Sequence, residues 1–432
     1  MHVMIIGAGI GGLCLAQRLR RDGVGVTVHE RDTTPALRHQ GYRLHLNADG
    51  QRALHHALPP DLWRLFLDTA GRPGPRSVFL DHHLGLQWVA ESGEDLPPLA
   101  VDRLTLRRIL LAGLDDVVRF GRRLTGYEVH DSGAVTARFA DGTSATGDVL
   151  VAADGVNSVV RRQYLPHARV VDTGLRNLYG TIPLDGRTRE LFSADMFNVF
   201  TAIVGPGNAF IGVAPVEFPT PVRAKGLLGE PTFPDTGRAE GLLGEPAFPD
   251  TGRAEKLLGE PAASASPGAA AVRSGAARDY MTCSFGTRAE LLPVTDAELH
   301  RMSGEQLRAM VLDLVEGWHP RVRRIVSHWD PAGIFPAVLR TSVPVEPWPT
   351  TTVTLLGDAI HAMSPAGGIG ANTALRDARA LATALAEASR GRPLVPALRD
   401  YETAMTGYGF AAVRESAANG HRFLGQNPLP VP

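Results

Sequence analysis

Cysteine and lysine are both scarce in this chain of 432 residues. The two cysteines, Cys14 and Cys283, exclude a disulfide framework and any zinc or iron–sulfur site built from several cysteines. The two lysines, Lys225 and Lys256, both lie in an internal repeat. We therefore expect no Schiff-base lysine, no phosphate-binding Walker A lysine and no metal site.

An excess of charge of one sign and long apolar runs are also missing. Lys and Arg total 44 and Asp and Glu total 45, so the formal net charge is −1. Because phosphate neutralisation needs a basic face, this balance argues against nucleic acid as a partner. No apolar run approaches the ~18 residues that a membrane helix needs, and the chain enters an apolar strand without a basic leader. We expect a cytoplasmic protein without a membrane span, and its oligomeric state stays open.

The chain opens with the pattern strand, glycine turn, helix, strand. The apolar run Val3–Ile6 leads into Gly7, Gly9 and Gly12, spaced as G-x-G-x-x-G, and Glu30 closes the next strand. Glycines at this spacing allow a tight turn and close backbone approach to a pyrophosphate, which the following helix N-terminus attracts. Glu30 can accept the adenosine-ribose hydroxyls and would repel a 2′-phosphate. The pattern predicts a site for NAD or FAD rather than NADP.

A second strand, turn and helix lie more than 300 residues further on. The apolar strand 352–356 leads into Gly357, Asp358 and a glycine-rich stretch that ends at Asn372. A simple NAD dehydrogenase needs no second site, whereas an extended dinucleotide with a ribityl chain does. Asp358 could bind a ribityl hydroxyl, and N–H groups at the helix start could stabilise a reduced flavin. The two patterns together favour FAD; a strand–loop–helix with a buried Asp cap is the alternative.

A third apolar strand, Val149–Ala153, ends in Asp154 and Gly155 before a basic helix. Asp-Gly is also a common turn, so this motif alone is not specific.

The chain also repeats itself. Residues 226–240 and 241–255 differ only at Thr232 versus Ala247, and a partial third copy starts at Lys256. The unit is rich in Pro and Gly and has few apolar residues to bury. We predict a flexible insertion over 219–278; a partner-binding tether is the alternative.

Together the three motifs resemble the class A flavoprotein monooxygenases with the para-hydroxybenzoate hydroxylase fold, nearest to the branch that inactivates tetracyclines. Further stretches fall in that family's order and spacing: His29–Asp32, Arg38, Gly41–Leu46, Gly50-Gln51 and Asp102-Arg103-x-x-Leu106.

The resemblance implies an α/β fold, with a Rossmann-like FAD-binding domain interleaved with a β-sheet substrate-binding domain and followed by a C-terminal helix. The FAD-binding domain would comprise residues 1–75, 100–175 and 340–395. The substrate-binding domain would comprise residues 76–99, 176–218 and 279–339. Residues 396–432 would form the C-terminal helix and tail.

The resemblance also implies roles for single residues. Glu30 and Arg31 would bind the adenosine end of FAD, and Arg103 would reach its ribityl or pyrophosphate region. Asp154 belongs to a motif linked to FAD and the nicotinamide cofactor, and Asp358 would bind the ribityl chain.

The isoalloxazine ring would be lined by Pro365 and the backbone of 367–372, including Gly370, Ala371 and Asn372. Arg38 matches an arginine implicated in nicotinamide binding, although a solvated loop arginine fits equally. His45 departs from the acidic FAD contact of the tetracycline branch.

The implied activity is that of an FAD-dependent monooxygenase. NADPH or NADH would reduce FAD, O2 would form a C4a-hydroperoxyflavin, and an aromatic or polycyclic molecule of secondary (antibiotic) metabolism would be hydroxylated or epoxidised. No side chain is assigned as catalytic, because the flavin carries the chemistry. An FAD-dependent oxidase or reductase without oxygen insertion is the alternative, and a non-catalytic binding protein is a third possibility. The following residues could line an apolar substrate site or fill a sheet core: Met196, Phe197, Phe210, Tyr280, Met281 and Phe285.

Overall fold

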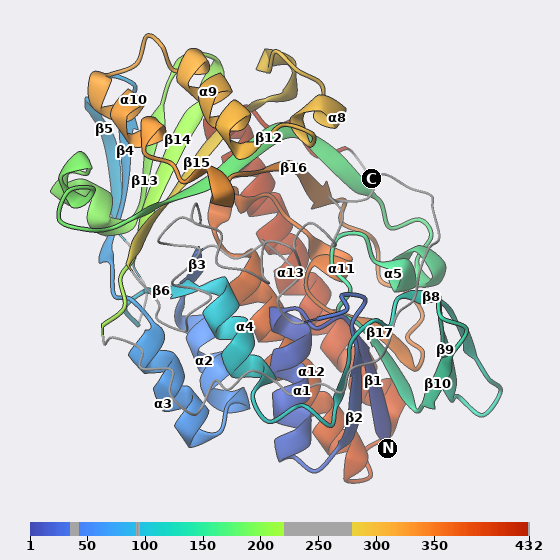
Figure 1. The fold of residues 1–432 in the computed structure, drawn as a ribbon. Helices are drawn as coiled ribbons and strands as arrows, with labels where there is room; N and C mark the ends of the chain where they lie inside the picture. The colour runs from blue at the N-terminus through green and yellow to red at the C-terminus, as the bar shows by residue number, and fades with distance from the viewer. Residues whose placement is uncertain (35–42, 92, 94–95, 220–278, 431–432) are drawn as a thin grey trace.

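The computed structural model describes residues 1–34, 43–91, 93, 96–219 and 279–430 (Figure 1). The predicted insertion at 219–278 lies, apart from Pro219, outside the described residues, as does Arg38.

The first layer is a parallel sheet of five strands in the order β17-β11-β1-β2-β7. Its strands are β1 (His2–Ile6), β2 (Gly25–His29), β7 (Val118–Arg119), β11 (Val149–Ala152) and β17 (Val353–Leu355). The strands β11 and β17 are buried throughout, as is usual for parallel strands covered on both faces. Because the strands are parallel, the loops that follow β1, β2, β11 and β17 leave the same edge of the sheet.

Helices and a small antiparallel sheet cover this layer (Figure 1). The helices are α1 (Ile10–Arg21), α2 (Ala48–Ala57), α3 (Pro60–Thr69), α4 (Arg103–Leu111), α5 (Val159–Tyr164) and α12 (Gly370–Ser389). The small sheet consists of β8 (Leu124–Val129), β9 (Val135–Phe139) and β10 (Ser144–Gly147). Apolar side chains of β1, α1, β9 and α12 share one continuous core.

The second layer is a sheet of seven strands in the order β16-β12-β15-β14-β13-β4-β5. Its strands are β4 (Gly74–Asp81), β5 (Leu86–Glu91), β12 (Val170–Pro183), β13 (Asn198–Val204), β14 (Phe210–Val216), β15 (Tyr280–Arg288) and β16 (Phe335–Ser342). One face is covered by α8 (Asp296–Leu299), α9 (Gly304–Leu314) and α10 (Pro320–Ser327) (Figure 1). A second core fills the space between this face and those helices.

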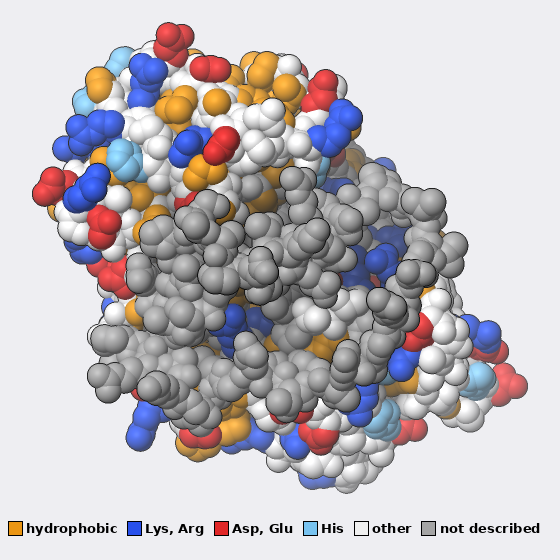
Figure 2. All heavy atoms as spheres, viewed as in Figure 1, with side chains coloured by type: hydrophobic (Ala, Val, Ile, Leu, Met, Phe, Trp, Pro, Cys, Tyr) orange, Lys and Arg blue, Asp and Glu red, His pale blue; other side chains and the backbone are white. Residues whose placement is uncertain are grey.

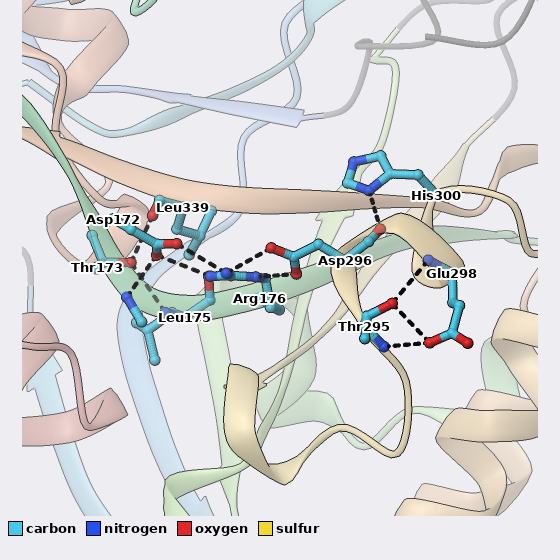
Figure 3. A network of polar contacts seen from close by, with 10 residues as sticks. Asp172, Thr173, Leu175, Arg176, Thr295, Asp296, Glu298, His300 and Leu339 are labelled. Carbon is cyan, nitrogen blue, oxygen red and sulfur yellow. Dashed lines mark hydrogen bonds and ion pairs between the residues drawn. The ribbon is translucent and has the colours of Figure 1, made fainter. Parts of the chain in front are cut away.

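Arg176 connects the second sheet to α8 through ion pairs (Figure 3). Its guanidinium donates to both carboxylate oxygens of Asp172 at 2.9 Å, and to those of Asp296 at 2.6 and 2.8 Å. The side chain of Arg176 is only 7% exposed, whereas both aspartates reach solvent. Hydrogen bonding to Asp296 raises the pKa of Arg176 above its usual value, so the guanidinium of this cross-link stays protonated.

The two layers meet at the short sheet of β3 (Arg43–Leu46) and β6 (Leu99–Asp102). Tyr280 Oη donates to Asp102 Oδ2 at 2.9 Å, and Arg43 Nε donates to the carbonyl of Pro215 at 3.0 Å. The helices α11 (Asp358–His361) and α13 (Leu394–Leu424) also lie between the layers.

This architecture agrees with the predicted α/β fold and C-terminal helix. The domain boundaries stay predictions. Charged side chains of both signs are interspersed on the visible face (Figure 2). Within the described part of the chain, no helix is both long and apolar enough to cross a membrane.

Candidate functional site

The glycine turn after β1 is shaped by backbone crowding on one side and open space on the other. Gly7 has φ +109°, and a Cβ there would lie 2.3 Å from the carbonyl oxygen of Ala153. A Cβ at Gly12 would lie 2.3 Å from the carbonyl oxygen of Gly7. A Cβ at Gly9, by contrast, would meet nothing within 4 Å. No side chain caps α1, so its first N–H groups face this open space and can receive a phosphate.

Glu30 holds the glycine turn from the end of β2. It is 4% exposed, and its two oxygens accept from the N–H groups of Ala8, at 2.7 Å, and Asp32, at 3.0 Å. Glu30 also lines the pocket beside the turn, where a carboxylate can accept from a ribose hydroxyl. Arg31, which follows it, is exposed.

A small pocket adjoins this turn and is lined by both acidic and basic side chains. Its lining residues are Ala8, Gly9, Ile10, Glu30, Arg103, Leu104 and Arg107. Arg107 donates to the carbonyl of Ala8 at 3.1 Å. The sequence motif pointed to Arg103 but not to Arg107; their i,i+4 spacing, which places both on one face of α4, was the available signal.

Asp154 lies where β11 ends, directly against the glycine turn. A Cβ at Gly7 would approach its Cα to 3.0 Å. Oδ2 of Asp154 accepts from the N–H of Val159 at 2.8 Å, whereas Oδ1 is buried and has no hydrogen-bond partner. Burial raises the pKa of this carboxyl group. Asp154 Oδ1 is thus a buried acceptor that lacks a partner on the crowded side of the glycine turn, which carries an energetic cost.

Asp358 begins α11 after the Gly357 turn, which has φ +60°. Its side chain is accessible, yet protein atoms surround it closely enough for desolvation to raise its pKa, against the opposing effect of His361 and Arg103. A Cβ at Gly11 would lie 2.8 Å from Leu356 Cδ1, so the second motif packs against the start of α1 at the carboxyl edge of the parallel sheet.

The start of α12 supplies N–H groups without a side-chain cap. Pro365 is exposed, and Gly368, with φ +64°, turns the chain into the helix at Gly370. Gly370 and Ala371 are partly exposed, so their N–H groups can face a ligand.

Asn372 is different, because its side chain is engaged within the protein. It is 2% exposed; its Oδ1 accepts from the N–H of Asn47 at 3.0 Å, and its Nδ2 donates to the carbonyl of His45 at 2.9 Å. A Cβ at Gly50 would lie 2.3 Å from Asn372 Oδ1. The side chain therefore joins α12 to the β3–α2 connection, and only the backbone is left for a cofactor.

A buried polar cluster supports this turn from behind. His361 and Asp377 are both fully buried, and His361 Nε2 lies 2.6 Å from Asp377 Oδ2. Asp377 also accepts from the N–H of Gly357 at 2.7 Å and from the Tyr408 hydroxyl at 2.7 Å. Burial acts to lower the pKa of His361, but the neighbouring carboxylate outweighs it and the pKa is raised. Its burial against Asp377 gives His361 a structural role.

The seven-stranded sheet has one face covered by α9 and α10 and an opposite face directed toward the first layer. Side chains alternate along the strands, so Met281 and Phe285 face the helices and belong to the second core, together with Met196. The opposite face of the same sheet carries half-buried side chains, namely Tyr179, Phe200, Thr282 and Phe335. Thr282 Oγ1 is buried without a hydrogen-bond partner. The aromatic set predicted from sequence is thus divided: Met196, Met281 and Phe285 are core.

These features fit an extended dinucleotide with a flavin at one end. The open backbone at Gly9, the unpaired Asp154 oxygen and two helix starts without a side-chain cap converge at one edge. Among the described residues, no cluster of His, Cys, Asp and Glu is arranged to hold a metal ion. The individual site residues stay predictions, and Arg38 cannot be placed.

Comparison with known proteins points the same way. Residues 5–69 match an NAD(P)-binding Rossmann-like domain, and residues 336–416 match an FAD binding domain. The chain is 31% identical over 99% of its length to a dual O-methyltransferase/FAD-dependent monooxygenase, CTB3 of Cercospora beticola, and covers 47% of it. It thus spans about half the length of the first curated relatives it matches. It is 26% identical to the FAD-dependent urate hydroxylase of Klebsiella pneumoniae, over 93% of this chain and 85% of that one.

Solved structures share the fold. A candidate FAD-containing monooxygenase of Photorhabdus luminescens superposes with a TM-score of 0.78 at 31% identity, over 98% of both chains. The tetracycline destructase Tet(51), at 16% identity and a TM-score of 0.58, shares the fold alone. These comparisons support a monooxygenase and not the alternative of an oxidase or reductase.

Proposed function

Because the chain belongs to the FAD-dependent monooxygenases of class A, we propose that it uses FAD, NAD(P)H and O2 to insert one oxygen atom into an aromatic or polycyclic small molecule. The observation that carries this proposal is the convergence of the glycine turn after β1 and the 357–372 segment at one sheet edge. Two segments so far apart in sequence can then hold opposite ends of one cofactor.

The chain's own residues would bind and orient the cofactor. The α1 N-terminus and Arg107 suit the pyrophosphate, Glu30 the adenosine ribose and Asp358 the ribityl chain. The α12 N-terminus would place its positive end at the electron-accepting edge of the ring. FAD, when bound, takes a hydride from NAD(P)H and activates O2. No side-chain nucleophile is required.

The face of the large sheet opposite α9 and α10 supports an aromatic substrate. Tyr179 and Phe335 pack there with ring centroids 5.3 Å apart. Such a surface suits a planar ring, because aromatic side chains supply apolar contact. We place the substrate in secondary metabolism, including antibiotic biosynthesis, and the protein in the cytoplasm, where two buried free thiols stay reduced.

The decisive experiment is labelling with 18O2. The purified protein should be yellow and retain FAD, and a panel of aromatic compounds should be scored for stimulated NADPH oxidation without release of hydrogen peroxide. With the best compound, 18O from O2 should appear in the product. A protein that binds no flavin, or a product without 18O, would contradict the proposal.

A further inference from the structure

A pocket of about 390 Å³ opens between α1, α2 and α12, away from the glycine turn. It is lined by Arg18, Arg21, Arg52, His55, His56 and Arg379. Arg18 and Arg21 lie in the last turn of α1, whose first turn faces the cofactor site. At 1.5 Å per residue, the two ends of this helix are about 17 Å apart. The pocket volume falls in the range of about 300–1,000 Å³ that is typical of small-molecule sites.

Positive charge in this pocket exceeds negative charge. Arg18 pairs with Asp22 at 2.8 Å, and Arg52 lies 3.5 Å from Asp49. Arg21 donates to the carbonyls of His56 and Leu58. Among the described residues, neither Arg21 nor Arg379 forms an ion pair. Two of the four guanidinium groups therefore have no carboxylate partner in that part of the chain.

Burial and the excess of positive charge both lower the pKa of a neighbouring histidine. Burial lowers the pKa of His56, and Arg18, Arg379 and Arg21 lower it further. His56 Nδ1 is buried and has no hydrogen-bond partner. Arg18 and Arg21 also donate to backbone carbonyls at the end of α2, which fixes both guanidinium groups before any ligand arrives. Preorganised arginines bind an anion without losing further side-chain freedom.

We propose that this pocket binds a small anionic molecule through a phosphoryl or pyrophosphoryl group, at a site separate from those of FAD and the substrate. Guanidinium groups present parallel donors that match phosphate oxygens, and here they converge from three helices. The proposal does not depend on the monooxygenase activity, since it rests on a different set of residues.

The test uses the FAD-loaded protein and inorganic pyrophosphate as the probe. Titration calorimetry near physiological salt should show one saturable site. Arg52→Gln and Arg379→Gln leave the two arginines that hold α2 in place, and together they should weaken binding by about tenfold or more, because charge-assisted hydrogen bonds are lost. Arg399→Gln, an exposed arginine on α13, is the matched control and should bind as the unchanged protein does.

Two results would overturn the proposal. One is an absence of saturable binding, or equal affinity in the double variant and in Arg399→Gln. The other is a raised KM for NADPH in the double variant, which would assign the pocket to the co-substrate instead of a separate ligand. Thermal melting of each variant shows whether it is folded, and the single variants serve if the double variant is not.

Discussion

At the scale of the residue, the glycines of the first motif serve two different purposes. Gly7 and Gly12 are crowded by backbone atoms of the protein, so any side chain there displaces the turn. Gly9 has φ −76° and ψ 177°, a conformation open to any residue, and faces empty space. Because nothing in the fold requires glycine at position 9, we propose that its role is to let a ligand approach the backbone.

This difference predicts opposite results for two alanine substitutions. Gly9→Ala should leave the melting temperature of the apoprotein within about 2 °C, because surface changes without strain cost little. It should raise the Kd for FAD by about tenfold, or ~1.4 kcal/mol, because the methyl group meets the pyrophosphate. Gly12→Ala should destabilise the apoprotein itself. Flavin fluorescence titration and thermal unfolding check both, and equal FAD affinity in Gly9→Ala and the parent would contradict the assignment.

At the scale of the element, the His361–Asp377 pair holds three helices together. Asp377 on α12 binds His361 of α11, the Gly357 turn and Tyr408 of α13. A Cβ at Gly409 would lie 2.7 Å from the His361 ring, so α13 packs directly on it. The position of the α12 start, where we propose that the flavin ring binds, depends on this buried cluster.

The raised pKa of His361 makes this support depend on pH. A histidine whose pKa is higher in the folded state adds stability that is fully present below its unfolded pKa of about 6.5 and is lost as pH rises through the folded value. The free energy of unfolding of the protein should therefore fall more steeply above about pH 6.5 than that of His361→Gln, which can donate to Asp377 but carries no charge. Urea titrations from about pH 6 to 9 measure this, and parallel curves for the two proteins would refute it.

At the scale of the whole molecule, Asp102 takes part in one of the polar contacts that join the two layers. Asp102 caps α4 through Oδ1, which accepts from Thr105 N at 2.7 Å, while Oδ2 accepts from Tyr280 of the second sheet. The residue that precedes Arg103 in the cofactor motif is thus also the link to the proposed substrate layer. Movement of one layer relative to the other would change the hydrogen bond between Tyr280 and Asp102.

Removing that contact should weaken the whole molecule while sparing the cofactor site. Tyr280→Phe should lower the free energy of unfolding by about 1–2 kcal/mol, because it leaves Asp102 Oδ2 without its phenol donor in a buried position. FAD affinity should change less than threefold, since neither atom lines the glycine turn. Denaturant unfolding and flavin titration on the same preparation separate the two effects; a large loss of FAD with unchanged stability would be the opposite outcome.

Much of the fold followed from local patterns. Apolar runs ending in Gly7, Asp154 and Asp358 mark parallel strands, because each motif needs a strand to present its turn. The glycine spacings predict where the backbone could approach a ligand. These relations span only a few residues, so they can be recognised in the sequence.

Only the tertiary structure determined the contacts between residues far apart in the chain. It placed Arg107 beside the glycine turn, engaged the Asn372 side chain with His45 and Asn47, buried His361 on Asp377, and gathered arginines of three helices into one pocket. No local pattern encodes such contacts, because they depend on how helices and sheets pack.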